Sequence, residues 1–191
     1  MTKHQVSISK YLSYILRHKP EKIGLELDGE GWAEIDKLIE LSNISGQSLT
    51  YDTVQEVVVT SDKQRFAISP DGKRIRANQG HSVSVNLGLV SCEPPPLLFH
   101  GTAVRSIDSI RKKGLLPGSR QHVHLSSDAT TATIVGSRHG VPVVLIVRAM
   151  EMYHDGFEFW LSDNGVWLTV NVPFRYLDFP NNSEIKFDDC I

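Results

Sequence analysis

The spacing of apolar residues changes once along the first half of the chain, and no other feature constrains the fold as strongly. Apolar residues recur at helical spacing in residues 7–18, 33–42 and 50–59. They then alternate with polar residues in 65–69 and 73–77, on either side of Pro70-Asp71-Gly72. Proline presets φ and glycine accepts a positive φ, so this tripeptide predicts the turn of a β-hairpin. Three short helices followed by a two-stranded wing indicate a winged-helix module.

The expected ends of these helices follow from capping chemistry. Ser7 is the expected N-cap of the first helix, and Pro20 is its expected stop. In the third helix, Val54, Val57 and Val58 are expected to face the core.

The second half of the chain follows a different pattern. Residues 81–96 are weakly patterned and end in Pro94-Pro95-Pro96, which predicts a linker. From residue 97 onward short apolar strands alternate with helices, among them a helix capped by Asp128. A hairpin is expected around Asp163-Asn164-Gly165. The prediction is an α+β protein with lobes at residues 1–80 and 97–191, joined by a linker over 81–96.

Charge and composition exclude several classes of protein. Residues 1–80 carry 11 Lys and Arg against 11 Asp and Glu, so contacts with nucleic acid are expected to be local. The longest apolar run, residues 143–147, is too short to span a bilayer, and the N-terminal residues contain no apolar segment of a secretory signal. Cys92 and Cys190 fit no metal-binding spacing. These features favour a cytoplasmic protein without a disulfide framework.

Several polar residues occupy positions at which they could serve either a functional or a purely structural role. Arg17 and His18 close the first helix, where cations also relieve the helix dipole, and Arg138 lies at another expected helix end. Arg65 points outward from the hairpin, as an ordinary exposed arginine would. Residues 79–82 follow a strand, and their backbone N–H groups and side chains could hold an oxyanion or form a solvated loop.

The second half offers two further candidates. His100-Gly101-Thr102 follows an apolar strand and precedes a helix. Gly101 would let a ligand approach the backbone and Thr102 would cap the helix, with a plain strand-to-helix turn as the alternative. His122 and His124 are expected on one face of a strand, but no third ligand at a metal-binding spacing accompanies them. The chain has no Rossmann fingerprint, no P-loop and no H-E-x-x-H or G-x-S-x-G motif.

Taken together, in this order and spacing, these segments resemble the RNA 2′-phosphotransferase family, often called tRNA 2′-phosphotransferases. The resemblance covers almost the whole chain. It is carried by Leu16-Arg-His-Lys-Pro20, Gly31-Trp32, Gln64-Arg-Phe66, Ile75-Arg-Ala-Asn-Gln-Gly-His-Ser82, Phe99-His-Gly-Thr102, His122-Val-His-Leu-Ser126, Val135-Gly-Ser-Arg138 and Asn164-Gly-Val-Trp-Leu-Thr169.

The resemblance implies a winged-helix RNA lobe, a second lobe related to ADP-ribosyltransferases, and a reaction that consumes NAD⁺ without a metal. The implied substrate is an RNA with an internal 2′-phosphate, which attacks C1″ of the nicotinamide ribose and displaces nicotinamide. The ribose O2″ then attacks phosphorus, so that RNA leaves with a free 2′-hydroxyl and ADP-ribose 1″,2″-cyclic phosphate forms. No obligate protein partner is implied.

The resemblance also implies the site residues. Arg17, Arg65 and Arg138 would orient the phosphate and stabilise charge in the second step, because arginine binds phosphate bidentately and stays charged. His18 would transfer a proton or donate a hydrogen bond in that step. The contacts to NAD⁺ would come from His100, Gly101, Thr102, His124 and Ser126. The contacts to RNA would come from Gln79, Gly80, His81 and Ser82.

Two other functions compete with this one. Protein ADP-ribosyltransferases use a glutamate on a late strand, and the corresponding place here, near Val166, is apolar. This argues against ordinary protein modification, but an ADP-ribosyltransferase acting on terminal phosphates of nucleic acid or on protein is the first alternative. The second is a winged-helix regulator with a ligand-sensing lobe. The balanced charge of residues 1–80 disfavours it, because duplex-binding proteins usually rely on a basic surface.

Overall fold

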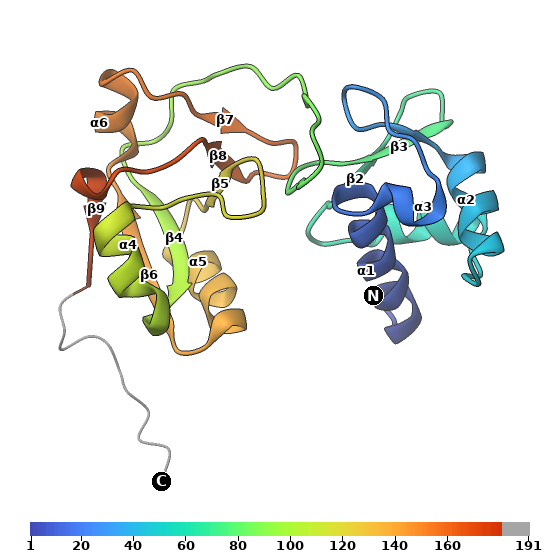
Figure 1. Cartoon of the computed structure of the whole chain (residues 1–191), viewed down its shortest axis with the longest axis horizontal. Helices are drawn as coiled ribbons and strands as arrows, with labels where there is room; N and C mark the ends of the chain where they lie inside the picture. Colours follow the sequence, from blue (N-terminus) through green and yellow to red (C-terminus); the bar gives the residue numbers. More distant parts are fainter. Residues whose placement is uncertain (181–191) are drawn as a thin grey trace, which may run out of the picture. The chain divides into compact units, whose positions relative to one another are not determined.

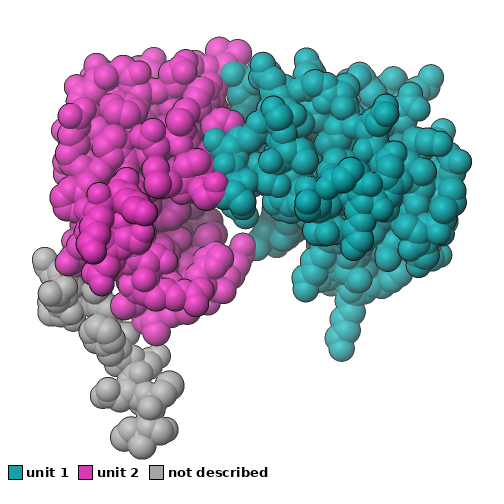
Figure 2. Space-filling model, in the orientation of Figure 1, with its two compact units in different colours: residues 1–89, 119–121 teal, residues 90–118, 122–191 magenta. Residues whose placement is uncertain are grey.

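The computed structural model describes residues 1–180 and divides them into two compact units. Unit 1 contains residues 1–89 and 119–121, and unit 2 contains residues 90–118 and 122–180 (Figure 2). The division after residue 89 falls inside the segment expected as a linker. Ser82 N donates to Arg17 O at 2.9 Å within unit 1, and Cys92 N donates to Phe159 O at 2.9 Å within unit 2. The segment is therefore shared between the two units.

Unit 1 consists of short helices and a small antiparallel sheet in the strand order β1-β3-β2 (Figure 1). The expected hairpin of β2 and β3 is confirmed, and its turn closes with Gly72 N donating to Ser69 O at 2.8 Å. The elements are α1 (Lys3–Arg17), the 3₁₀ turn η1 (Pro20–Ile23), β1 (Ala33–Glu34), α2 (Ile35–Ile44), α3 (Tyr51–Val59), β2 (Phe66–Ile68) and β3 (Arg74–Ala77).

The helix α1 begins earlier than expected. Thr2 is its N-cap: the Thr2 hydroxyl accepts a hydrogen bond from Gln5 N at 3.2 Å, and Gln5 Oε1 accepts one from Thr2 N at 2.6 Å. This reciprocal capping box stabilises a first turn that the apolar pattern does not reach. Ser7 lies inside the helix, so the prediction of a Ser7 cap is wrong. The helix ends at Arg17, ahead of Pro20 as expected.

The core of unit 1 anchors α1 along its apolar face. Leu12, Ile15 and Leu16 are fully buried against residues of the other helices and of the sheet. Burying an aliphatic side chain contributes about 1.5–3 kcal/mol. In α3, Val54 and Val57 are fully buried, and the half-buried Val58 packs against the same core. The end of α1 is therefore held firmly in unit 1.

Unit 2 contains two three-stranded antiparallel sheets, in the orders β4-β6-β9 and β5-β8-β7, within its described residues. A β-bridge between Phe99 and Ser126 connects them. The expected cap of α5 is confirmed, because Asp128 Oδ1 accepts from Thr131 N at 2.7 Å. The elements are β4 (Leu98–Ala103), η2 (Val104–Ser106), α4 (Ile107–Lys113), β5 (Val123–Leu125), α5 (Ala129–Gly136), η3 (Ser137–His139), β6 (Pro142–Val147), α6 (Ala149–His154), β7 (Trp160–Leu161), β8 (Trp167–Thr169), η4 (Phe174–Tyr176) and β9 (Leu177–Asp178).

The strand β4 runs through His100, Gly101 and Thr102, which were expected to follow a strand. It pairs with β6 over its whole length, with Gly101 opposite Val144. Thr102 is therefore a strand residue, and the prediction that it caps the next helix is wrong, because Ala103 precedes η2. The long pairing with β6 extends the strand past its apolar start.

The architecture is a mixed α/β arrangement with small antiparallel sheets. Within residues 1–180, no helix combines the length and the apolar character that crossing a membrane requires. Cys92 forms no disulfide there, and Cys190 lies outside the described residues.

Candidate functional site

The C-terminal end of α1 holds Arg17 inside unit 1. Its guanidinium carbon lies 5.9 Å from the centre of the Phe66 ring, and Nη2 donates to the Arg65 carbonyl at 3.4 Å. Gly80 has a φ of +89°, and a Cβ there would lie 3.6 Å from Arg17 Nη1. The guanidinium is thus packed between β2 and the segment that follows β3.

Ser82 and Val83 cap this end of the helix. Ser82 N and Val83 N donate to the Arg17 carbonyl at 2.9 Å and 3.3 Å. The Ser82 hydroxyl lies 3.0 Å from His18 Nδ1. Helices leave their last carbonyls without internal partners, and this segment satisfies one of them. The Ser82 N–H is therefore used in the fold, while its hydroxyl orients the His18 ring.

The charges at this end of unit 1 repel each other. Burial is the main cause that lowers the pKa of Arg17 to about 10, and the charges of Arg65 and Arg120 lower it further. The pKa of His18 is lowered by burial, then by Arg17 and Arg120. Within residues 1–180 no carboxylate forms an ion pair with Arg17, and its Nε is buried without a hydrogen-bond partner. Such a cluster favours binding of an anion, which would relieve the repulsion.

Arg120 is a member of this cluster that the sequence interpretation missed. Gln121 N donates to the His81 carbonyl at 3.1 Å, and Gln121 Nε2 donates to the Val85 carbonyl at 3.0 Å. These bonds make residues 119–121 part of unit 1. Arg138, the predicted fourth cation, lies exposed in η3 of unit 2. The sequence signal that could have pointed to Arg120 as a site residue is its position just before the His122–Ser126 motif.

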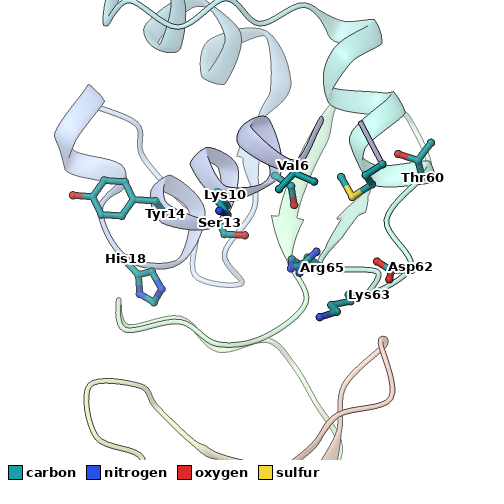
Figure 3. A pocket seen from close by; sticks show the side chains of 11 residues that line it. Val6, Lys10, Ser13, Tyr14, His18, Thr60, Asp62, Lys63 and Arg65 are labelled. Carbon is teal, nitrogen blue, oxygen red and sulfur yellow. The ribbon is translucent and has the colours of Figure 1, made fainter. Parts of the chain in front are cut away.

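His18 and Arg65 line one groove of unit 1 with a volume of about 660 Å³ (Figure 3). One wall is α1, and the other is the segment between α3 and β2. The groove is open to solvent at both residues, so a phosphate group could reach them. Its lining residues are Met1, Val6, Ser9, Lys10, Ser13, Tyr14, His18, Thr60, Asp62, Lys63 and Arg65.

His81 lies in the interior rather than on a surface that RNA could contact. Its side chain is 1% exposed, and neither ring nitrogen has a hydrogen-bond partner. Burial, followed by the charges of Arg17, His18 and Arg76, lowers its pKa to about 4. The ring is therefore neutral at pH 7 and packs behind the cationic cluster. A direct contact of the His81 ring with RNA does not fit this burial.

Replacing His81 by leucine should remove a specific acid sensitivity of unit 1. The unfolded chain protonates His81 near its ordinary pKa of 6.5, whereas the folded chain does so only near 4. Its contribution to stability is complete above pH 6.5 and is lost as the pH falls towards 4, by about 3 kcal/mol. Urea unfolding at pH 7.5 and 4.5 should show wild type losing about 2–3 kcal/mol more than His81→Leu.

The control for this experiment is His4→Leu, which changes an exposed histidine of α1. It should lose stability in parallel with wild type. Equal losses in wild type and His81→Leu would contradict the assignment of a neutral, buried His81.

In unit 2, hydrogen bonds bring His100 next to β5. The Nδ1 atom of His100 lies 3.0 Å from the His124 carbonyl, which can only accept, so Nδ1 carries the proton. Phe99 and Ser126 exchange backbone hydrogen bonds at 2.9 Å and 2.8 Å. Burial is the main cause that lowers the pKa of His100, and this leaves Nε2 as a lone-pair acceptor. The structure therefore brings together three of the predicted NAD⁺ contacts, His100, His124 and Ser126.

Because side chains alternate along β4, Gly101 faces the opposite side of the strand from its neighbours. His100 and Thr102 line a groove of about 490 Å³, together with Arg105 and Lys113. The opposite face of the strand packs on α5, where a Cβ at Gly101 would lie 1.7 Å from the Ala132 carbonyl oxygen. The structure thus requires a glycine here for close packing of the helix on the strand, rather than for the approach of a ligand.

No metal site is evident in the part of the chain that the structure describes. Residues 1–180 contain no group of three or more His, Cys, Asp and Glu side chains that could hold a metal ion. His122 precedes β5, and its ring lies 5.2 Å from the Trp160 ring. The strand β5 begins at residue 123, one residue later than expected, and the half-buried His122 and His124 alternate with the buried Val123 and Leu125.

Comparison with known proteins identifies the family. A sequence model of the "RNA 2′-phosphotransferase, Tpt1 / KptA family" matches residues 3–171. The chain is 57% identical over 180 residues to a "Probable RNA 2′-phosphotransferase" of Agrobacterium fabrum, covering 94% of this chain and 97% of that protein. A protein of the same description from Acaryochloris marina is 54% identical over 170 residues, covering 89% and 94%. With this match across most of its length, the chain belongs to the RNA 2′-phosphotransferase family.

Proposed function

We propose that this protein removes an internal 2′-phosphate from RNA and consumes NAD⁺ as a co-substrate. The products are RNA with a 2′-hydroxyl, free nicotinamide and ADP-ribose 1″,2″-cyclic phosphate. The observation that carries the proposal is the cationic cluster at the end of α1, in which the half-buried Arg17 lies near Arg65 and Arg120 and has no carboxylate partner. A dianionic phosphate is the ligand that this arrangement suits best.

In the proposed site, Arg17, Arg65 and Arg120 hold the phosphate and stabilise the charge that develops when the RNA 2′-oxygen leaves. The charge of Arg120 acts on both Arg17 and His18, which supports its inclusion alongside the predicted Arg138. His18 donates a hydrogen bond or a proton to the departing oxygen, and Ser82 at 3.0 Å fixes the orientation of its ring. His18 is half-buried in the groove, where substrate can reach it.

The groove of unit 2 fits the polar parts of a dinucleotide. When bound, NAD⁺ supplies the electrophilic ribose carbon and the ribose hydroxyl that receives the phosphorus. His100 Nε2 would accept a hydrogen bond from a ribose hydroxyl, and Arg105 and Lys113 would face the pyrophosphate. His124 and Ser126 support His100 through the backbone bonds between β4 and β5. Gly101 acts by seating β4 on α5.

The proposal assigns separate roles to the two units. Unit 1 serves as a winged-helix RNA lobe, which its helices and its β2–β3 hairpin support. Unit 2 serves as a lobe of the ADP-ribosyltransferase type. We propose a cytoplasmic location, where both RNA and NAD⁺ are present.

The test combines the purified protein, NAD⁺ and a short oligoribonucleotide with one internal 2′-phosphate, without added metal. Mass spectrometry should show RNA lighter by one phosphoryl group, together with nicotinamide and ADP-ribose cyclic phosphate. The control is the same oligonucleotide with a 2′-hydroxyl and a terminal phosphate. An RNA heavier by ADP-ribose at its terminal phosphate would favour the alternative ADP-ribosyltransferase. Nicotinamide release without any change in RNA mass would refute the proposed acceptor.

A further inference from the structure

The groove of unit 1 offers more cationic groups than a single 2′-phosphate uses. Besides His18 and Arg65, it is lined by Lys10 and Lys63, with Asp62 as its acidic residue. Lysines and arginines equal the acidic residues over residues 1–80, so this excess is a local feature. Within a longer strand, an internal 2′-phosphate is flanked by a phosphodiester on each side. The additional lysines are suited to these neighbouring phosphates.

The groove follows α1 away from the cationic cluster. Lys10 and Tyr14 stand on successive turns of one face of α1, and His18 follows as the C-cap, about 12 Å from Lys10 along the axis at about 1.5 Å per residue. Figure 3 shows the groove with the side chains of α1 along one wall and Lys63 and Arg65 on the other. Lys10 is exposed, and within residues 1–180 it forms no ion pair.

Tyr14 adds an aromatic surface to this row. The residue is 41% exposed, and Lys22 Nζ lies 5.2 Å from the centre of its ring. An exposed aromatic ring among cations is the combination with which proteins bind single-stranded nucleic acid. Stacking of this kind requires an unpaired base, because the bases of a duplex are already stacked on each other.

We propose that this groove binds single-stranded RNA beside the 2′-phosphate, with Lys10 and Lys63 at backbone phosphates and Tyr14 stacked on a neighbouring base. The inference rests on the proposed function, since it takes the cluster of Arg17, His18 and Arg65 as the site of the 2′-phosphate. It adds the substrate class: an unpaired strand that extends beyond the modified nucleotide.

The test measures binding of fluorescent oligoribonucleotides by anisotropy in the absence of NAD⁺. The probes are a dinucleotide and an octanucleotide, each with one internal 2′-phosphate, and a hairpin with the 2′-phosphate in its base-paired stem. Wild type should bind the octanucleotide at least tenfold more tightly than the dinucleotide or the hairpin. Lys10→Gln should reduce this advantage and lower the slope of log affinity against log salt by about 0.7. Tyr14→Ala should weaken octanucleotide binding about tenfold, and Tyr14→Phe should restore it.

The matched control is Lys37→Gln, an exposed lysine of α2 that pairs with Glu40 outside this groove. It should bind all three probes as wild type does. Equal binding of the dinucleotide and the octanucleotide by wild type, or an unchanged salt slope in Lys10→Gln, would overturn the inference. So would binding of the hairpin as tight as that of the octanucleotide. A wild type that shows the expected binding yet removes no phosphate with NAD⁺ would instead refute the proposed function.

Discussion

Arg17→Gln is expected to slow removal of the 2′-phosphate by about 100- to 1,000-fold, the usual loss when one donor to a developing oxyanion is removed. The first step needs only the anionic phosphate as nucleophile, whereas the second develops charge on phosphorus. An RNA heavier by ADP-ribose should therefore accumulate, and quenched-flow mass spectrometry would detect it. A matched variant, Arg74→Gln, changes an exposed arginine paired with Asp28 and should keep the wild-type rate.

The same substitution should leave unit 1 as stable as before or more so. The fall of the Arg17 pKa from its ordinary value to about 10 corresponds to about 3 kcal/mol against its charged form in the fold. That cost is present throughout the neutral range, because the charge persists in both folded and unfolded chains below pH 10. Removing it offsets the lost bond to the Arg65 carbonyl and the contact with Phe66. A melting temperature well below that of wild type would contradict this account.

Inorganic phosphate provides a further check that does not depend on turnover. A bound anion relieves the repulsion between Arg17, Arg65 and Arg120, so phosphate should raise the melting temperature of wild type. It should raise that of Arg17→Gln much less.

The same assay, together with activity measurements, distinguishes the role of Arg120 from that of Arg138. We expect Arg120→Gln to lose both the phosphate response and at least ten times more activity than Arg138→Gln. The reverse order would make Arg138, rather than Arg120, the more important of the two cations for turnover.

The sequence correctly predicted features that depend only on residues close to one another along the chain. The Pro70-Asp71-Gly72 turn, the Asp128 cap and the apolar face of α3 are confirmed, because each depends on neighbouring residues. The start of α1 was missed although its capping box is also local, because Thr2 and Gln5 precede the apolar pattern that was used to find the helix.

The cluster at the end of α1 could be predicted only in part. Arg17, His18 and Arg65 stand out in the sequence through their motifs. Arg120 is brought to unit 1 by hydrogen bonds from Gln121 to His81 and Val85, which are distant in sequence. Burial of the His81 ring is likewise a result of tertiary packing, since its motif reads as a polar loop. Such long-range contacts cannot be predicted from the apolar pattern of any single segment.

The length of β4 could likewise be predicted only in part from the sequence. The apolar start of the strand predicts only its first residues, and its continuation through His100-Gly101-Thr102 depends on pairing with β6. Once these residues are in a strand, alternation decides their roles, because neighbouring residues face opposite sides. His100 and Thr102 face the groove, while Gly101 faces α5.

Gly101→Ala should therefore prevent unit 2 from folding rather than only weaken binding of NAD⁺. A Cβ at this position would lie 1.7 Å from the Ala132 carbonyl oxygen and 2.9 Å from Gly136 N, and both are backbone atoms of α5. They can move only if the helix leaves the strand, which would open the buried packing around Ala132. Overpacking a core commonly costs about 1–3 kcal/mol, and a clash with two backbone atoms of α5, which cannot yield while the helix stays in place, exceeds that range.

Because domains are stable by only about 5–15 kcal/mol, losing the packing of α5 on β4 as a whole leaves unit 2 largely unfolded. Hydrogen exchange should show lost protection in β4, α5 and β6, and α1 and β3 of unit 1 should keep theirs. Gly156→Ala is the matched control: its φ is +90° but a Cβ there meets nothing within 4 Å, so it should cost only about 1 kcal/mol. A folded Gly101→Ala protein that had merely lost affinity for NAD⁺ would contradict this account and show that the glycine serves the ligand.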